Sequence, residues 1–164
     1  MRVIGLWAMV LVLFYALQTS LFTFINCDGF SANLMLLFTV SVAFLRGNEL
    51  GAFFGFMAGL LQDATSGSYF GLATFSYMTI GLLFGKFSVN LFREQSILPV
   101  ISSVPALAIH FAITIIFLFL LDRPVDLVRF LREDFWYIAI MQVVLAYPVH
   151  RVVIELNKFS KQRR

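Results

Sequence analysis

The sequence predicts an all-α, polytopic membrane protein, in which residues 1–164 form a single domain of six transmembrane helices. Of the 164 residues, 60% are hydrophobic and only 13% are charged, and the mean hydropathy is +0.90. Soluble domains contain about 45–50% apolar and about 25% charged residues, so a soluble fold of this length could not bury so much apolar surface. The composition therefore excludes a cytosolic enzyme, a secreted disulfide scaffold and a disordered chain.

Apolar runs with few or no charges define the expected spans, since a spanning helix needs about 20 mostly apolar residues. The first run is too long and lacks the cleavage site of a signal peptide, so we interpret it as an uncleaved span. The second and third runs are short enough to be partly re-entrant, which leaves five spans as the alternative. The six runs are Val3–Phe24, Phe30–Leu45, Leu50–Gln62, Leu72–Leu91, Ile97–Leu121 and Phe135–Ile154.

The distribution of basic residues predicts the orientation of these spans. With six spans both termini lie on one side, and that side holds nine of the twelve Lys and Arg residues. The positive-inside rule then places both termini in the cytoplasm, with residues 155–164 as a short basic tail. Five spans would put this tail opposite Arg2, which fits the rule less well. No basic face or motif indicates binding to nucleic acid, despite the net charge of +3.

Glycines at helical spacing mark one face of the third run. Gly51, Gly55 and Gly59 recur every four residues, and in lipid such glycines let two helix backbones approach closely. This face could pack inside the bundle or receive a helix from another protein. The pattern favours neither alternative, because it recurs in many unrelated membrane helices.

A polar segment follows this run and begins with Gln62 and Asp63. The helix dipole opposes an acid at a helix C-terminus, so we expect Asp63 to cap the following turn, accepting hydrogen bonds from the amides of Thr65 or Ser66. Alternatively, Gln62 and Asp63 contact a partner protein. The candidate partner-binding residues are Gly51, Gly55, Gly59, Gln62, Asp63, Gly67 and Gly71.

Polar residues within the later spans form a second, sparser candidate. His110 lies near the middle of an apolar run, where an ionisable group suggests function, although a neutral histidine bonded inside the bundle is the more common case. With Ser103, Gln142 and Tyr77 it could form a buried polar site for a small solute. Clustered nucleophiles and the HExxH and GxSxG motifs are missing, so we expect no enzyme activity, no metal and no cofactor.

The segment Phe54–Asp63, with the sequence FGFMAGLLQD, and the segment Gly67–Tyr77, with GSYFGLATFSY, resemble the bacterial rod shape-determining MreD family. The patterned resemblance covers about residues 50–90, and the rest of the chain matches in hydropathy. The resemblance implies a fold similar to the six-helix substrate-binding subunits of energy-coupling-factor transporters. It also implies that the protein has no catalytic activity.

The resemblance further implies a subunit of the cell-wall elongation machinery that maintains rod shape, located in the bacterial cytoplasmic (inner) membrane. The implied partners are MreC, through its membrane helix, and MreB, RodA, an elongation-specific penicillin-binding transpeptidase and RodZ in a larger complex. We expect the glycines of the third helix, ending at Asp63, to receive the MreC helix. The alternative is a small-solute-binding membrane subunit of a transporter.

Overall fold

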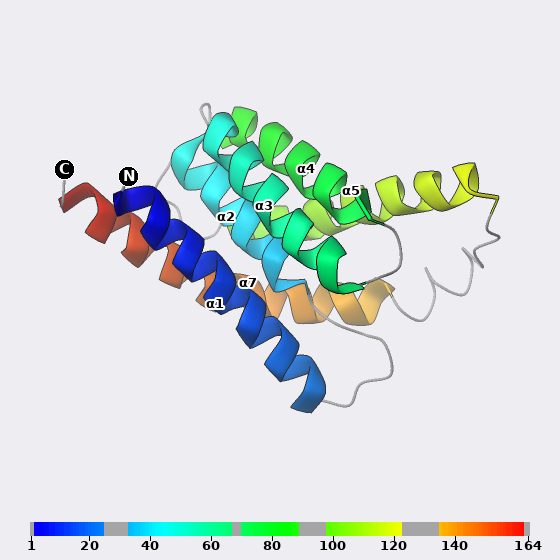
Figure 1. The fold of residues 1–164 in the computed structure, drawn as a ribbon, viewed down its shortest axis with the longest axis horizontal. Coiled ribbons are helices and arrows are strands. Elements are labelled where there is room, and N and C mark those ends of the chain that lie inside the picture. The colour runs from blue at the N-terminus through cyan, green and yellow to red at the C-terminus, as the bar shows by residue number, and fades with distance from the viewer. Residues whose placement is uncertain (1, 25–32, 67–69, 89–97, 123–134, 163–164) are drawn as a thin grey trace.

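The computed structural model describes residues 2–24, 33–66, 70–88, 98–122 and 135–162 (Figure 1). Within these residues the secondary structure consists of six α-helices, which confirms the all-α prediction. The helices are α1 (Arg2–Phe24), α2 (Leu34–Arg46), α3 (Asn48–Ser66), α4 (Leu72–Ser88), α5 (Leu98–Leu120) and α7 (Phe135–Gln162).

Two helices extend beyond the limits that the apolar runs suggested. Helix α3 continues four residues past Gln62, and the Thr65 hydroxyl in its last turn donates to the carbonyl of Leu61 at 3.1 Å. Helix α7 continues to Gln162, so most of the predicted tail 155–164 is helical. Hydropathy marks where a helix leaves the apolar layer, and both helices continue past that point with polar residues.

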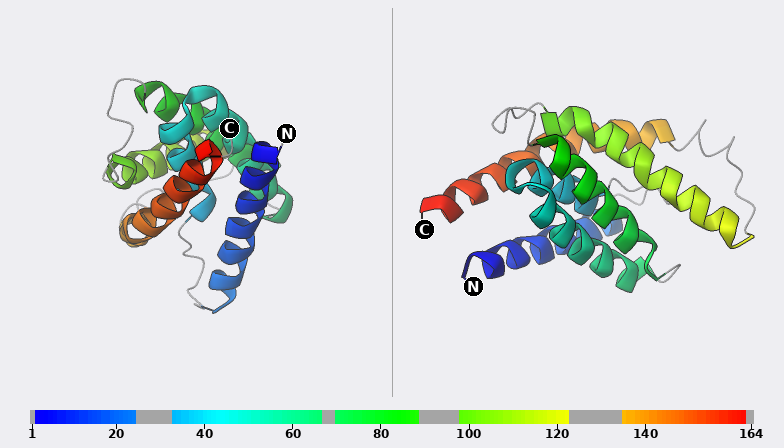
Figure 2. Two further views of the ribbon diagram at one scale, coloured as in Figure 1. Left: turned by 90° about the vertical axis from the view of Figure 1, so that its left-hand side faces the viewer. Right: turned by 90° about the horizontal axis from the view of Figure 1, so that it is seen from above.

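Helix α2 lies at the centre of the bundle. Every residue of Leu34–Phe44 is buried, and the helix contacts α1, α3, α4, α5 and α7 (Figures 1 and 2). A helix that is apolar on all sides is compatible with this enclosed position, although in a membrane it could also face lipid. The side chain of Asn33 caps its first turn, accepting a hydrogen bond from the Leu36 amide at 3.3 Å.

Helices α3 and α4 form an antiparallel hairpin on one side of α2 and make the most extensive helix contact of the described residues. Helix α1 packs against α2 and α3 through a cluster of three aromatic rings, Trp7 on α1, Phe38 on α2 and Phe54 on α3. The ring of Trp7 lies 6.4 Å from that of Phe38 and 5.9 Å from that of Phe54, and Phe38 and Phe54 are themselves 6.2 Å apart.

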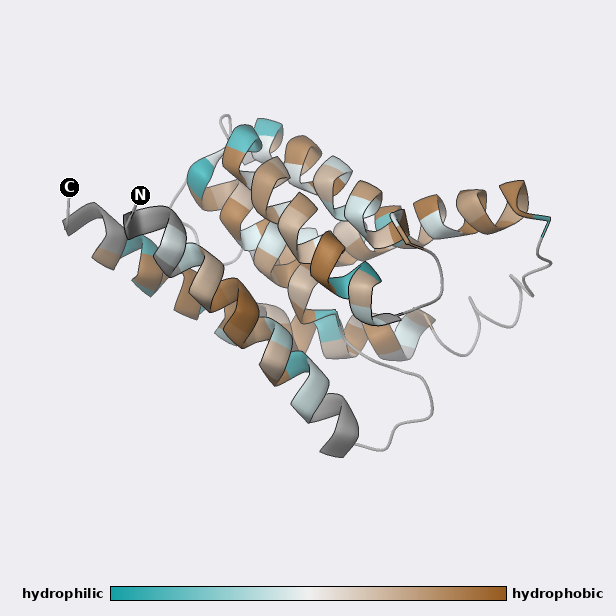
Figure 3. Cartoon of the chain, in the orientation of Figure 1, coloured by the Kyte–Doolittle hydropathy of each residue, from teal (hydrophilic) through white to brown (hydrophobic). Residues whose placement is uncertain are grey.

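Among the described residues, two helical segments are long and apolar enough by themselves to cross a membrane: Val100–Leu120 in α5 and Ile138–Phe159 in α7, with 21 and 22 residues. The last turns of α5 project past the rest of the bundle in Figure 1, and much of the helical ribbon has the colours of hydrophobic residues in Figure 3. The start of α1 and the end of α7 lie together at one end of the bundle (Figures 1 and 2).

Candidate functional site

The three glycines of α3 face this chain's own helices. A Cβ atom added at Gly55 would lie 2.5 Å from the carbonyl oxygen of Tyr77 on α4 and 2.9 Å from the Thr39 methyl group on α2. At Gly59 it would lie 2.6 Å from the carbonyl oxygen of Ala73. Real Cβ atoms do not approach other atoms this closely, so only glycine allows the backbones of α3 and α4 to touch.

Glycines on α4 lie against the backbone of α3 in the same way. A Cβ atom at Gly51 would lie 2.8 Å from the carbonyl oxygen of Gly81, and one at Gly81 would collide with the backbone of Gly51. Likewise, one at Gly85 would collide with the backbone of Asn48. These contacts correspond to the alternative in which the stripe packs inside the bundle. A partner helix would have to displace α4 to reach it, so the expected direct contact with MreC does not agree with this packing.

The carboxylate of Asp63 binds the start of α4 from the last turn of α3. It accepts hydrogen bonds from the amides of Gly71 at 3.0 Å, Ala73 at 3.0 Å and Thr74 at 2.9 Å, and from the Thr74 hydroxyl at 2.5 Å. The first amides of a helix lack partners within the helix and carry partial positive charge, so they are favourable donors to an anion.

Asp63 therefore caps the N-terminus of α4 and not, as we expected, the turn at Thr65 and Ser66. The amides of Thr65 and Ser66 belong to α3, which runs on to Ser66, so they are not the donors that Asp63 binds. The side chain is 6% exposed and lies against α4 instead. Gly71, with φ of +101°, lets the chain turn into α4 beside the carboxylate.

Gln62 bonds to the first helix. The Gln18 side chain donates to the Gln62 side-chain oxygen at 2.9 Å and accepts from the Met35 amide at 3.1 Å, so it joins α1, α3 and α2. Gly67 lies outside the described residues. The polar candidates on α3 that the structure describes are thus bonded to other parts of this chain.

Gln142, Tyr77 and His110, from the second candidate site, belong to a buried polar network. The side chain of Gln142 on α7 accepts from the Asn33 amide at 2.9 Å and donates to the Asn33 carbonyl at 3.3 Å. The Asn33 side chain donates to the hydroxyl of Tyr77 on α4. The rings of Tyr77 and His110 are 5.3 Å apart, and His110 Nδ1 lies 2.8 Å from the Ser76 hydroxyl.

Two members of this network, Asn33 and Ser76, were not among the predicted site residues. Asn33 lies inside the predicted run Phe30–Leu45, and nothing in the local sequence indicates its contact with Gln142, 109 positions away. Ser103, which we expected to join His110 and Gln142, instead donates to the Val100 carbonyl of its own helix at 2.6 Å.

Among the described side chains, those of Asp63, Gln18 and Gln142 use their hydrogen-bonding groups to connect helices, whereas hydroxyls such as that of Ser103 bond within their own helix. The described side chains include no cluster of three or more His, Cys, Asp or Glu residues that could hold a metal ion. Ser76 is fully buried beside His110, and the carboxylate of Asp63 is engaged by α4. The fold and this arrangement define a membrane protein of packed apolar helices whose polar groups serve helix contacts.

Comparison with known families identifies which kind of membrane protein this is. Residues 1–158 match the family described as rod shape-determining protein MreD, and the chain belongs to that family. It is therefore a non-catalytic membrane protein of rod shape determination, as the resemblance implied. No curated protein and no solved structure matches the chain, so the similarity to energy-coupling-factor subunits stays a prediction.

Proposed function

We propose that this protein is a membrane subunit of the cell-wall elongation machinery that binds MreC through packing of transmembrane helices. Membership of the MreD family, across residues 1–158, is the observation that carries the proposal. An assembly subunit needs rigidly positioned helices and no chemistry. The contacts of Asp63, Gln18 and Gln142 between helices supply that rigidity.

The outward face of α3 is our candidate surface for the MreC helix. This face lies opposite the glycine stripe and presents Phe53, Phe56 and Leu60, which are 48%, 38% and 36% exposed. Spacings of three and four residues place the three side chains in one row. In this proposal the residues predicted to bind the partner act indirectly: Gly51, Gly55 and Gly59 hold α3 against α4, and Gln62, Asp63 and Gly71 fix the end of the hairpin.

The orientation and the wider complex follow from the same proposal. The start of α1 and the end of α7 lie at one end of the bundle (Figure 1), an arrangement that supports six spans. The positive-inside rule assigns that end to the cytoplasm, in the bacterial inner membrane. MreB, RodA, the elongation-specific penicillin-binding transpeptidase and RodZ are the further partners that the family implies.

Removal of the protein from a rod-shaped source cell tests its role. Depletion should convert rods to rounded cells, visible by microscopy, and expression of the wild-type chain should restore them. A strain that stays rod-shaped after complete depletion would contradict the proposed role.

Co-purification from membranes tests the MreC surface. Replacing Phe53, Phe56 and Leu60 together by alanine should lower MreC recovery per molecule of this protein. The matched control is the triple alanine variant of Ile116, Phe119 and Leu120 on α5, which are also exposed. Equal recovery with both variants would rule out this face of α3 while leaving the shape function untouched.

The solute-binding alternative relied on His110, Ser103 and Gln142. Each of the three forms a hydrogen bond within the chain, with Ser76, the Val100 carbonyl and Asn33 respectively. These bonds describe helix contacts, and they offer no specific support for a solute site.

A further inference from the structure

Helix α7 carries two opposite charges within its candidate membrane span, Ile138–Phe159. Arg151 and Glu155 lie eight and four residues before the end of this span, which corresponds to about 12 and 6 Å along the helix axis. Both side chains are exposed, so the helices of this chain do not enclose them. Charged side chains inside a membrane span are costly in lipid and usually pair with a group of opposite charge.

The two charges are not paired with each other along α7. The guanidinium of Arg151 lies over the ring of Tyr147, 5.7 Å from its centroid, and therefore one turn away from Glu155 in the opposite direction. An arginine four residues before a glutamate is also the less favourable order for an ion pair within one helix. Within the part of the chain that the structure describes, neither charge forms an ion pair. Both are thus available to a group outside this chain.

These charges belong to a continuous row on the exposed side of α7. Successive members of the row are three or four residues apart, so they lie above one another on the helix surface. The opposite side of the helix is buried, with Gln142, Val149 and Val153 among its residues. The exposed row consists of Ile140, Val144, Tyr147, Arg151, Glu155 and Lys158.

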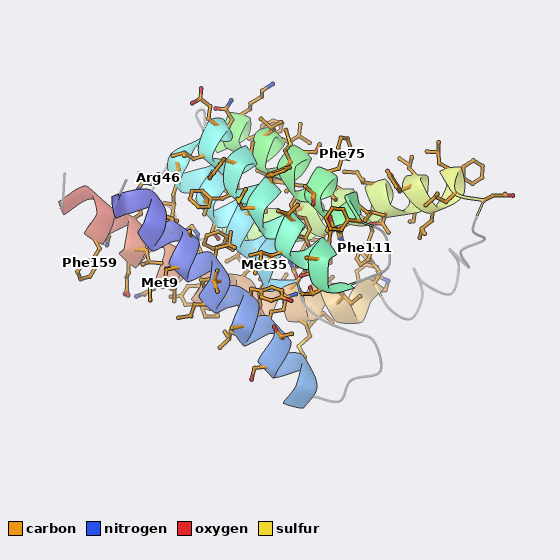
Figure 4. The ribbon with its side chains drawn as sticks, in the orientation of Figure 1. Met9, Met35, Arg46, Phe75, Phe111 and Phe159 are labelled. Atoms are coloured by element: carbon orange, nitrogen blue, oxygen red, sulfur yellow. The ribbon has the colours of Figure 1, made fainter. Side chains whose placement is uncertain are left out.

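The exposed row is separate from the surface that we propose for MreC. Helix α7 packs against α2 and α5, whereas α3 packs against α2 and α4. Phe159, one residue after the end of the row, is exposed and lies at the edge of the bundle in Figure 4. This side of α7 is therefore open to another membrane helix while α3 keeps its own outward face.

A second copy of this chain supplies the charges that the exposed row lacks. Copies inserted by the same rule have the same orientation, so a twofold axis between them is normal to the membrane and makes their α7 helices parallel. In parallel helices packed along the row, Arg151 of each copy lies one turn, about 6 Å along the axis, from Glu155 of the other. An arginine side chain can bridge this offset, and its guanidinium forms paired hydrogen bonds with a carboxylate.

We propose that the protein forms a twofold dimer through the exposed row of α7, with two reciprocal ion pairs between Arg151 of one copy and Glu155 of the other. Each pair neutralises two charges that a single copy leaves exposed inside the span. Ile140 and Val144 pack against their equivalents in the second copy, where association depends on van der Waals contact. Because one row holds both charges, the surface is complementary to itself, as a closed dimer requires.

Energy transfer between donor-labelled and acceptor-labelled copies of the full chain in liposomes measures dimerisation as the protein-to-lipid ratio is varied. Wild-type transfer should rise to a plateau. Arg151→Glu and Glu155→Arg should each weaken dimerisation about tenfold, because each variant places like charges in both contacts. Lys86→Glu, at an exposed position of α4, is the matched control and should dimerise like the wild type. A wild-type chain that stays monomeric at every ratio, with lipid or another protein covering the row, would overturn the proposal.

Combining the two charge reversals distinguishes an ion pair between copies from a general loss of structure. The Arg151→Glu chain has two acids in the row and the Glu155→Arg chain has two cations, so a mixture of the two should recover energy transfer between them. A chain with both substitutions should also dimerise with itself. A mixture that recovers nothing would show that the charges do not pair across the interface.

Cross-linking tests the symmetry of the dimer. In a chain with Cys27→Ser, Val144→Cys places a thiol near the proposed twofold axis, so an oxidant should join two copies through a disulfide at this position. Val12→Cys, at an exposed apolar position on α1, is the control and should cross-link far less. Equal cross-linking of the two variants would contradict the parallel packing of α7.

Discussion

Replacing Asp63 by alanine should destabilise the hairpin more than the loss of an ordinary helix cap does. The carboxylate accepts three amide hydrogen bonds and one hydroxyl hydrogen bond at a buried position. Loss of a cap typically costs about 0.5–2 kcal/mol, and a hydrogen bond to a charged group is worth about 1.5–3 kcal/mol. Since neighbouring contributions do not add fully, we expect a loss of about 3 kcal/mol in unfolding free energy.

Denaturant unfolding in detergent micelles measures this loss. Two further variants separate the contributions of the individual hydrogen bonds to it. Asp63→Asn keeps the shape and one acceptor oxygen but turns an NH₂ group toward the amides, so we expect about half the effect. Thr74→Val removes the hydroxyl donor alone and should cost about 1 kcal/mol.

Asp122→Asn is the matched control for the loss of a carboxylate. Asp122 is exposed and has φ of +53°, a conformation that asparagine also tolerates, so the change should stay within about 0.5 kcal/mol. If Asp63→Ala unfolds as readily as this control and no more so, the carboxylate does not hold α4, and the account of the hairpin fails.

Two other contacts make similar predictions. Gly55→Ala places a Cβ atom 2.5 Å from the Tyr77 carbonyl oxygen, so overpacking of about 1–3 kcal/mol should outweigh the gain in helix propensity of about 1 kcal/mol. Gly5→Ala, with nothing within 4 Å among the described residues, should be neutral or stabilising, and equal melting of the two variants would contradict the close approach. A double-mutant cycle with Asn33→Ala and Gln142→Leu should give a coupling of about 0.5–1.7 kcal/mol in the same unfolding assay. A coupling near zero would show that the hydrogen bonds between Asn33 and Gln142 do not stabilise the contact between α2 and α7.

The helices were predictable because lipid-facing and core positions both demand apolar residues, which leaves long runs in the sequence. Their ends were harder to place. Hydropathy ended the third run at Gln62, whereas α3 continues to Ser66. That difference led to the wrong donors for Asp63, although its role as a cap was anticipated.

The sequence of α3 alone does not identify which helix packs against its glycine stripe. Spacing shows that a backbone comes close at Gly51, Gly55 and Gly59, but it does not show whose backbone. A signal for α4 as the partner was available in the sequence. Gly81 and Gly85 on α4 also have helical spacing, and antiparallel neighbours with matching small residues pack against each other.

The polar network was predicted by residue type and not by pairing. Gln142 and His110 were candidates, but their partners Asn33 and Ser76 lie 109 and 34 positions away. Such contacts depend on how whole helices are placed around α2, which no local pattern records.

The length of α2 has a consequence for how the protein enters the membrane. Its 13 residues span about 20 Å, whereas the hydrocarbon layer is about 30 Å thick. Isolated in lipid, it would leave Arg46 and its capping residue Asn33 within the apolar layer. We therefore expect α2 to remain at the membrane surface or in the insertion machinery during synthesis, and to settle across the bilayer only once α3 and α4 have emerged to enclose it.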